Sequence, residues 1–231
     1  MAFEASKKAA AIKAATYVVS GMRVGLGTGS TSEEMVKALA QRLITEKLDL
    51  VVVPTSAKIL ELAGSLGFQV APEYPDFAPL DIAIDGADEV DPQGGLIKGG
   101  GGALLREKLV AASAGRFVVM VDESKHVPGL GSTRGVPIEV IPFGWSRTLR
   151  DLQRLGFSQI NQRLANGKPF LSDHGNYIFD CAMGPIPDPG GLNLQVKALP
   201  GVVETGLFLG MSSLIITGSE DGTTRVREVC G

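Results

Sequence analysis

The chain has 231 residues, of which 44% are hydrophobic and 20% are charged, and its formal net charge is −3 at pH 7. This balance is typical of a soluble globular protein, and the slight negative charge argues against a nucleic-acid-binding surface, which normally carries a concentrated basic face. No apolar stretch approaches the roughly 18 residues needed to span a bilayer, so we expect neither a nucleic acid nor a membrane as a partner.

Cysteine and histidine are too sparse for a disulfide framework or a zinc site. The sequence contains two of each: Cys181, Cys230, His126 and His174. Two thiols in a chain of this size suit a reducing compartment, and a zinc site would need more ligands at close spacing. We therefore expect a cytoplasmic protein without a structural metal.

The first half of the chain alternates strands and helices. Residues 1–21 indicate an amphipathic helix rather than a signal peptide, because Lys7, Lys8 and Lys13 interrupt the apolar residues. Strand-like and helix-like segments then follow in turn, over residues 21–43 (a strand leading into a helix), 48–54, 56–67, 80–91, 101–115 and 116–125. This alternation predicts a mostly parallel sheet with helices on both faces.

The pattern changes after about residue 135. The segments that follow indicate a strand at 136–143, a helix at 146–156, short strands within 158–183, a helix at 188–201 and a strand at 202–208. The order β-α-β-β-α-β is that of a ferredoxin-like unit, after which residues 212–219 return the chain to the large sheet. We therefore expect a doubly wound, Rossmann-like α/β domain, residues 1–134 and 207–231, with a small ferredoxin-like α+β domain, residues 135–206, inserted near its C-terminal end.

The segment "GLGTGSTSEE" has the character of an anion site. It follows a strand and opens a helix, at the edge of the sheet where open parallel sheets bind ligands. Helix-start N–H groups carry partial positive charge, and glycines allow an anion to approach closely. A phosphate site, an ordinary Ser- or Thr-capped turn and a dinucleotide site are the three interpretations. The dinucleotide site is disfavoured, because Ser30 replaces the third glycine of that fingerprint and the next strand ends in Pro54 and Thr55 rather than an acid.

Acidic residues gather where the strand within residues 80–91 ends. Asp85 is followed by Asp88, Glu89 and Asp91. Neighbouring carboxylates repel one another, so one of them can take a raised pKa that suits proton transfer. A solvated acidic turn is the alternative, but the sheet directs Asp85 toward the ligand crevice.

A run of four glycines separates a cation from a carboxylate in "IKGGGGALLREK". Lys98 precedes the run, and Glu107 follows it on a predicted helix, where Ala103 shares its face. Each charged side chain taken alone is more often a solvated surface group, although a lysine can also stabilise an oxyanion. Lys125, after the strand that ends in "DESK", and Lys7, in the first helix, can reach the same crevice if their elements pack over the end of the sheet.

Taken together, these segments resemble the A type of ribose-5-phosphate isomerase over almost the whole chain. Four motifs match the active-site motifs of that family in order and spacing, and two match its C-terminal signatures: "GLGTGST", "DGADEVD", "KGGGGALLREK" and "DESK", then "HGNYIFD" and "LPGVVETGLF". The region around "GLNLQVKALPG" is less acidic and less asparagine-rich than the family pattern, which bears on oligomer packing more than on catalysis.

The resemblance implies interconversion of D-ribose 5-phosphate and D-ribulose 5-phosphate through an enediolate, without a cofactor or a metal. It places the general base at Glu107 and the oxyanion partner at Lys98, and it leaves hydroxyl protons and ring opening to Asp85 and Asp88. It also implies a homodimer or a homotetramer. The substrate-binding residues that it implies are Lys7, Thr28, Gly29, Ser30, Thr31, Gly86, Ala87, Gly99, Gly100, Gly101 and Lys125.

A non-catalytic sugar-phosphate sensor is the alternative, because related α/β domains serve as effector modules of transcription regulators. Such regulators carry a helix-turn-helix segment, for which we expect no room here, since the chain starts within about twenty residues of its first sheet strand. A sensor also has no need of Glu107 facing Lys98. A dinucleotide-dependent oxidoreductase is a third option, disfavoured by the missing glycine and acid.

A reaction that needs no metal should survive the removal of metal ions. We expect the rate of ribulose 5-phosphate formation from ribose 5-phosphate to be unchanged after dialysis against EDTA, since proton transfer by a carboxylate requires no Lewis acid. The rate is measured without added cofactor, before and after chelation. A loss of activity that added Mg²⁺ or Zn²⁺ restores would contradict this expectation.

Overall fold

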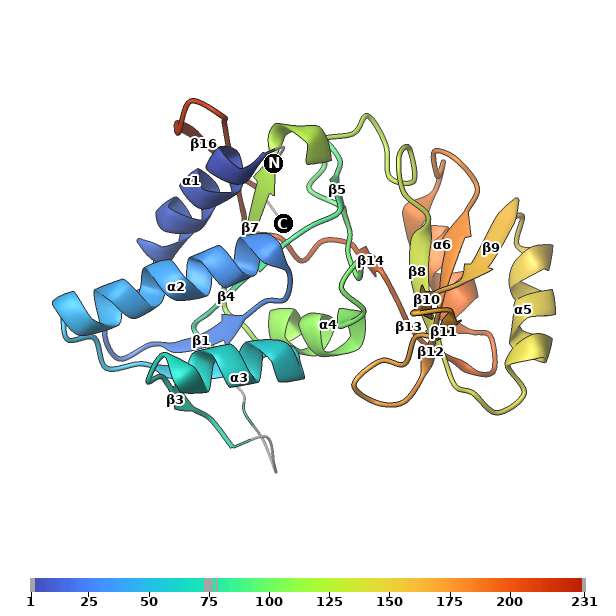
Figure 1. Cartoon of the computed structure of the whole chain (residues 1–231). Coiled ribbons are helices and arrows are strands. Elements are labelled where there is room, and N and C mark those ends of the chain that lie inside the picture. Colours follow the sequence, from blue (N-terminus) through green and yellow to red (C-terminus); the bar gives the residue numbers. More distant parts are fainter. Residues whose placement is uncertain (1–2, 73–76, 78, 230–231) are drawn as a thin grey trace. The chain divides into compact units, whose positions relative to one another are not determined.

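The computed structural model describes residues 3–72, 77 and 79–229 (Figure 1). The chain divides into two compact units. The first unit comprises Met1–Ala87, Arg106–Lys125 and Met211–Gly231, and the second comprises Asp88–Leu105 and His126–Gly210. The domain boundaries expected from the sequence, at residues 135 and 206, remain a prediction.

A seven-stranded sheet forms the centre of the first unit. Its strand order is β16-β15-β7-β4-β1-β2-β3, and every neighbouring pair is parallel except β15 with β16. The strands are β1 (Arg23–Leu26), β2 (Val51–Pro54), β3 (Gln69–Val70), β4 (Ile82–Gly86), β7 (Phe117–Asp122), β15 (Leu214–Gly218) and β16 (Thr224–Glu228). The mostly parallel, doubly wound sheet expected from the sequence is confirmed, and β16 is an antiparallel edge strand that the sequence pattern did not indicate.

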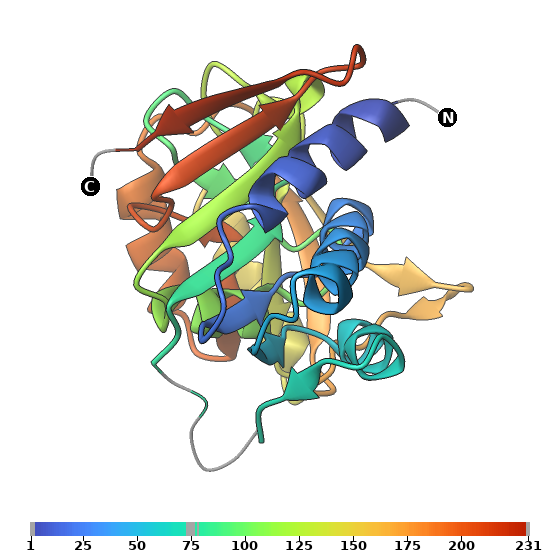
Figure 2. The ribbon, with the colours of Figure 1, turned by 90° about the vertical axis from the view of Figure 1, so that its left-hand side faces the viewer.

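Helices lie on both faces of this sheet. Helices α1 (Glu4–Ala15), α2 (Ser30–Thr45) and α3 (Ala57–Ser65) lie together over one face (Figure 2), where their apolar sides share one core with the strands. Helix α4 (Leu104–Ala112) packs on the opposite face. There Gly25 is needed for close approach, because a Cβ at this position would lie 2.3 Å from Cγ1 of Val110.

The point where the sheet winding reverses lies between β1 and β4. From β1 the chain passes to β2 and β3 on one side, and it later returns to place β4, β7 and β15 on the other. In open parallel sheets, ligands bind beyond the carboxyl ends of the strands at such a point. The loops after β1 and β4, residues 27–29 and 87–88, therefore hold the positions most suited to a ligand.

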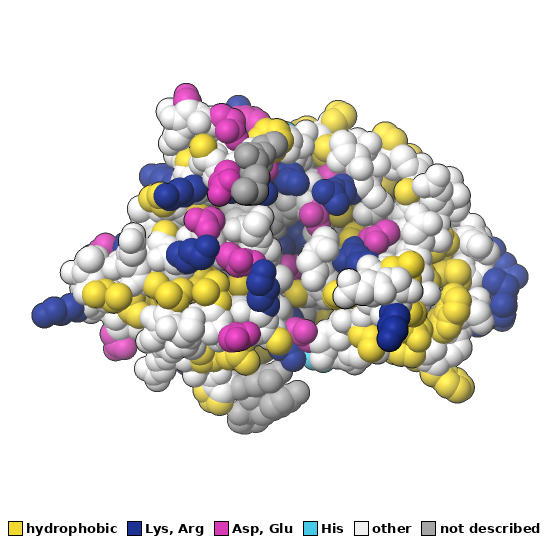
Figure 3. Space-filling model, viewed as in Figure 1, with side chains coloured by type: hydrophobic (Ala, Val, Ile, Leu, Met, Phe, Trp, Pro, Cys, Tyr) yellow, Lys and Arg dark blue, Asp and Glu magenta, His cyan; other side chains and the backbone are white. Residues whose placement is uncertain are grey.

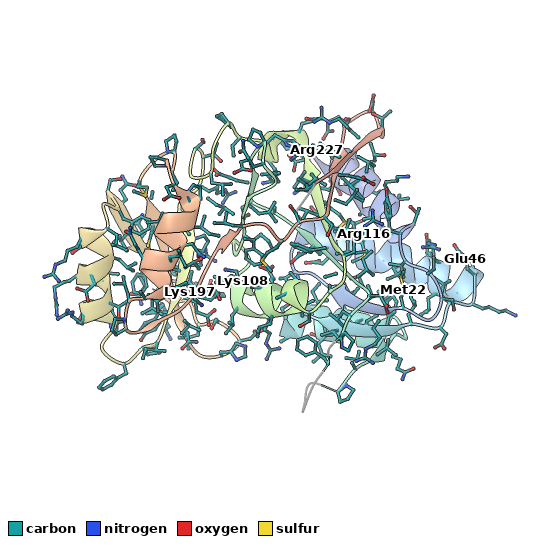
Figure 4. All side chains as sticks on the ribbon, turned by 180° about the vertical axis from the view of Figure 1, so that it is seen from behind. Met22, Glu46, Lys108, Arg116, Lys197 and Arg227 are labelled. Carbon is teal, nitrogen blue, oxygen red and sulfur yellow. The ribbon has the colours of Figure 1, made fainter. Side chains whose placement is uncertain are left out.

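The second unit is built on a four-stranded antiparallel sheet in the order β13-β8-β12-β9. Its elements are β8 (Val136–Val140), α5 (Trp145–Arg154), β9 (Gln159–Gln162), β12 (Tyr177–Ala182), α6 (Pro189–Lys197) and β13 (Val202–Thr205). This is the ferredoxin-like order expected from the sequence. Trp145 stacks on Phe179 in the core, with the ring centroids 5.7 Å apart. Lys197 of α6, labelled in Figure 4, donates to Glu204 of β13 at 2.8 Å.

Short strands complete the second unit. Strands β5 (Glu89–Val90), β6 (Leu96–Ile97) and β14 (Leu207–Phe208) form a three-stranded sheet, and β10 (Leu164–Ala165) pairs with β11 (Lys168–Pro169). The single strand expected at 202–208 is therefore two strands, β13 and β14, in different sheets. The chain changes sheets at Gly206, where a Cβ would lie 2.3 Å from the carbonyl oxygen of Lys98.

The charged side chains on the surface agree with the near-neutral net charge of the sequence (Figure 3). On the face shown in Figure 3, acidic and basic side chains are interspersed rather than gathered by sign. Among the described residues, no helix is long and apolar enough to cross a membrane. Cys181 is a buried free thiol, and burial raises its pKa. Cys230 lies outside the described residues.

Gly218 controls how closely α1 packs against the sheet. A Cβ at Gly218 would lie 1.9 Å from the carbonyl oxygen of Ser6, a backbone atom that cannot move aside without shifting α1. We expect Gly218→Ala to lower the free energy of unfolding by about 1–3 kcal/mol, the usual cost of overpacking. The midpoint of urea unfolding measures this effect.

Gly64→Ala is the matched control for this substitution. Gly64 lies in α3, where a Cβ would meet no atom within 4 Å. Because alanine favours a helix by up to about 1 kcal/mol over glycine, the urea midpoint of Gly64→Ala should stay unchanged or rise. Equal midpoints for Gly218→Ala and the unmodified chain would show that α1 tolerates the added methyl group.

Candidate functional site

Asp85 joins the loop after β1 to the end of β4. Its side chain is 3% exposed. Its Oδ1 accepts hydrogen bonds from the N–H of Thr28 at 3.1 Å, the hydroxyl of Ser32 at 3.0 Å and the N–H of Gly86 at 2.7 Å. A Cβ at Gly27 would lie 2.0 Å from this carboxylate. The glycine therefore makes room for the acid, and the acid fixes the loop.

The hydroxyl of Thr28 continues this network to the neighbouring strand. Its Oγ1 lies 2.8 Å from Oγ1 of Thr55 and 2.9 Å from Oγ of Ser56. Both partners follow β2, and Thr55 also donates to the carbonyl of Leu26 at 3.0 Å. The sequence pattern assigned neither Thr55 nor Ser56 to the site, because their contact with Thr28 depends on the pairing of β1 with β2.

The start of α2 carries the expected anion-binding features. Gly29 precedes the helix with φ +116°, a backbone conformation that favours glycine. Ser30 and Thr31 begin a helix of 16 residues, at the end where backbone N–H groups carry partial positive charge. Nζ of Lys7, on α1, donates to Oγ of Ser30 at 3.3 Å. Lys7 is thus brought to this loop, as expected if α1 packs over the end of the sheet.

Glu107 lies in the first turn of α4 and is 4% exposed. Its neighbours Arg106 and Lys108 are half-buried, and Lys108 is labelled in Figure 4. Glu107 is therefore not a solvated surface glutamate. Glutamates are seldom buried to this extent, which makes Glu107 a candidate for a chemical role.

Lys125 also belongs to the first unit. It ends the short 3-10 helix η1 (Glu123–Lys125), directly after β7, and it is half-buried. Strand β7 neighbours β4, with Met120 opposite Gly86. Lys125 therefore follows the carboxyl end of the strand next to the one that ends at Asp85, on the sheet edge where a ligand is expected.

The second unit holds Asp88, Lys98 and the glycine run. Oδ2 of Asp88 accepts the N–H of Gly100 at 2.8 Å. Lys98 is 2% exposed, and its Nζ lies 5.4 Å from the ring centroid of Phe208. Its backbone N–H donates to the carbonyl of Gly206 at 2.9 Å. The lysine is thus a buried ammonium over an aromatic face, an arrangement that attracts a cation electrostatically.

The sequence-predicted residues divide between the two units. The first unit holds Lys7, Thr28, Gly29, Ser30, Thr31, Asp85, Gly86, Ala87, Glu107 and Lys125, and the second holds Asp88, Lys98, Gly99, Gly100 and Gly101. The first group combines the start of a helix, two lysines and two buried carboxylates. The second combines a buried ammonium, a half-buried carboxylate and backbone groups of glycine.

The remaining acids of the strand-end cluster are structural. Glu89 is fully buried, and its carboxylate accepts four hydrogen bonds from the backbone of Gly131, Thr133 and Arg134 and from the hydroxyl of Thr133, at 2.6–2.7 Å. Asp91 accepts the N–H groups of Gln93 and Gly95 in a tight turn. Spacing alone could not separate these anchors from Asp85 and Asp88.

Arg163 is a contact of the glycine run that sequence reasoning missed. Its Nη1 donates to the carbonyls of Gly99 at 2.6 Å and Gly100 at 3.1 Å, while its other nitrogens bind Asp180. It comes from the segment after β9, some sixty residues beyond the run. No local pattern in the sequence connects the two.

Comparisons with known proteins agree on one family. A family model described as Ribose 5-phosphate isomerase A (phosphoriboisomerase A) matches residues 51–222. A ribose-5-phosphate isomerase A of Parvibaculum lavamentivorans is 47% identical over 94% of this chain and 95% of its own, and one of Synechococcus sp. is 49% identical over 96% of each.

Solved structures of the same family resemble the chain at lower sequence identity. A ribose 5-phosphate isomerase from Plasmodium falciparum is 38% identical, with a TM-score of 0.92 over 96% of this chain and 97% of its own. A D-ribose-5-phosphate isomerase in complex with phospho-erythronic acid is 37% identical, with a TM-score of 0.91 over the same shares.

The structural role of Glu89 can be measured as stability. We expect Glu89→Gln to lower the free energy of unfolding by at least about 1–3 kcal/mol, because its amide cannot accept all the donors that face the carboxylate. Urea unfolding measures the change. Glu228→Gln, an exposed glutamate on β16, is the matched control and should leave the midpoint unchanged. Equal stability of both variants would refute an anchoring role.

Proposed function

Because the chain belongs to the ribose-5-phosphate isomerase A family, we propose that Glu107 is the general base of its reaction. The protein is an aldose–ketose isomerase that interconverts D-ribose 5-phosphate and D-ribulose 5-phosphate. The reaction moves a proton between C2 and C1 of the open-chain sugar through an enediolate. A single carboxylate can serve both carbons, because they present their protons on one face of a cis-enediolate.

The burial of Glu107 is the observation that carries this proposal. A carboxylate in water is a weak base for a carbon acid, whereas one held away from water on a rigid element can be oriented at the reacting carbon and loses less basicity to solvation. Glu107 is 4% exposed on the first turn of α4. The flanking Arg106 and Lys108 are cations at neutral pH and cannot accept a proton, so Glu107 is the one of these three residues that can act as a base.

We propose that Lys98 stabilises the oxygen that gains negative charge as the proton leaves carbon. A preformed cation in a site with little water contributes most when charge develops, because it needs no reorganisation in the transition state. Lys98 is buried and its ammonium group lies over the ring of Phe208, which supports such a preformed position.

Asp85 and Asp88 are proposed to handle the hydroxyl protons and to assist opening of the furanose ring. Both carboxylates also accept backbone hydrogen bonds, Asp85 from Thr28 and Gly86, and Asp88 from Gly100. Those bonds fix the orientation of each carboxylate. An acid with a fixed orientation can transfer a proton to one hydroxyl with little entropic cost.

The phosphate of the substrate is proposed to bind at the start of α2. The helix-start N–H groups, the hydroxyls of Ser30 and Thr31, and Lys7 near Ser30 support this assignment. Lys125, Gly86, Ala87 and the glycines of residues 99–101 are proposed as further substrate contacts. The phospho-erythronic acid bound to a relative is consistent with such a site, since it combines a phosphate with a carboxylate that resembles an enediolate.

We further propose a cytoplasmic homodimer or homotetramer. A buried free thiol and a phosphorylated substrate, which does not cross a membrane unaided, support a reducing interior. Apolar side chains exposed on the second unit, among them Phe143, Leu171 and Leu194, support self-association. Sedimentation equilibrium distinguishes the dimer from the tetramer.

Replacing the base should abolish most turnover while leaving the fold intact. We expect Glu107→Gln to reduce kcat by about 10²–10⁴-fold, the usual contribution of a general base, with little change in competitive inhibition by inorganic phosphate. The assay follows ribulose 5-phosphate formed from ribose 5-phosphate.

Glu61→Gln, an exposed glutamate on α3, is the control and should keep the normal kcat. Near-normal turnover by Glu107→Gln would remove Glu107 as the base. No turnover by the well-folded unmodified chain would contradict the isomerase activity as a whole.

A further inference from the structure

The backbone of the glycine run, residues 99–102, is fixed by contacts, although four consecutive glycines suggest flexibility. Gly102 donates its N–H to the carbonyl of Gly99 at 2.9 Å, which closes a turn. Gly99 and Gly102 have φ of +105° and +82°, conformations that favour glycine. A Cβ at Gly102 would lie 2.5 Å from the ring of Phe170, so this ring packs directly on the backbone.

Arg163 holds the same run from its carbonyl side. Its Nη1 donates to the carbonyls of Gly99 at 2.6 Å and Gly100 at 3.1 Å. Two consecutive peptide groups therefore turn their oxygens toward one guanidinium. The side chain is 16% exposed, so the bonds are partly protected from solvent.

Asp180 fixes the direction of this guanidinium. The carboxylate accepts from both Nε and Nη2 of Arg163, which is the paired geometry that the planar fork of arginine favours. With these nitrogens engaged, Nη1 is left to point at the glycine carbonyls. A lysine in place of Arg163 could not make both sets of bonds, because its ammonium group is a single point of charge.

The planarity of the peptide bond transmits this constraint to the next N–H groups. In a trans peptide the C=O and the following N–H point in opposite directions. The N–H of Gly100, which belongs to the same peptide group as the Gly99 carbonyl, donates to Asp88. The N–H of Gly101 belongs to the same peptide group as the Gly100 carbonyl, so it points away from Arg163. Gly101 is itself exposed.

We propose that Arg163, held by Asp180, is a positioning residue that directs the Gly101 N–H at an oxygen of the substrate. The inference rests on the proposed function, in which the glycines contact the sugar. Without the guanidinium, the Gly100 carbonyl would lose the hydrogen bond that fixes the direction of the peptide between Gly100 and Gly101, and the Gly101 N–H would be less well preorganised as a donor. Such a donor matters most where negative charge develops, so its loss should reduce kcat more than substrate affinity.

A pocket beside the run gives a means to test this. It has a volume of about 330 Å³, and Asp88, Gly100, Arg163 and Asp180 contribute to its wall. If the side chain of Arg163 is removed, a small guanidinium ion can enter from this pocket and occupy the same place. If Arg163 served only to hold β9 in the fold, added guanidinium would not restore kcat.

The decisive variant is Arg163→Ala. We expect kcat for ribose 5-phosphate to fall by about tenfold to a hundredfold, the range that follows from a misplaced contact, while competitive inhibition by inorganic phosphate stays near normal and a cooperative urea transition shows that the variant is folded. Guanidinium chloride at about 20 mM should restore part of kcat, compared with sodium chloride at the same concentration. Arg163→Lys should show an intermediate loss without rescue.

Arg147→Ala is the matched control. Arg147 forms a similar pair with Asp151 on the exposed side of α5, and its hydrogen bond lowers the pKa of Asp151. It makes no contact with the glycine run, so its removal should change neither kcat nor the response to guanidinium.

Asp180→Asn covers the case in which Arg163→Ala does not fold. It keeps the size of the side chain but weakens the pairing with Arg163, and it should reduce kcat in the same direction by a smaller factor. A folded Arg163→Ala or Asp180→Asn with kcat within twofold of the unmodified chain would overturn the inference, and so would a loss that guanidinium leaves unchanged in Arg163→Ala.

Glu107→Gln, assayed in parallel, separates this inference from the proposed function. Its kcat should fall and should not respond to guanidinium. Normal turnover by Glu107→Gln would refute the role of Glu107 as the general base. The positioning role of Arg163 would then still stand or fall with the kcat of Arg163→Ala. Normal turnover by Arg163→Ala alone would refute only the positioning role.

Discussion

The carboxylate of Asp85 occupies the space beside Gly27 where any other residue would place a side chain. From there it accepts hydrogen bonds from Thr28 and Ser32, so one buried acid joins the end of β4 to the loop after β1 and to the first turn of α2. These elements meet where the sheet winding reverses. A ligand bound at the helix start therefore lies against a loop whose shape depends on this one carboxylate.

Acids that lie close together in one short segment have different surroundings. Asp85 and Asp88 lie at the ends of elements with carboxylate oxygens near backbone N–H groups of glycine. Glu89, one residue after Asp88, is buried, and its carboxylate accepts four hydrogen bonds from residues 131–134. Asp85 lies in β4, Asp88 in the loop that follows and Glu89 at the start of β5, so these three acids enter different environments although they are close in sequence. The two acids proposed to transfer protons are thereby separated from the anchoring acid.

Most of the architecture was predictable, because hydrophobic periodicity reports which side of an element is buried. The alternation up to Asp122 predicted the parallel sheet, and the change after residue 135 predicted the ferredoxin-like unit. Short elements and elements without a clear hydrophobic period were not predicted. Strand β16 has mostly exposed residues, and β14 has only two, so neither produces a period. The division of the 202–208 segment at Gly206 depends on the carbonyl of Lys98, which lies a hundred residues earlier.

The sequence by itself determined the elements, the family and the candidate residues, since motifs and periods are properties of neighbouring positions. Only the tertiary structure decided where each candidate lies and which groups surround it. It made Glu107 a buried carboxylate, placed Lys7 beside Ser30 and brought Arg163 and Asp180 to the glycine run. The physical reason is that burial and hydrogen bonding depend on residues far apart in the chain, whose meeting is set by strand pairing and helix packing.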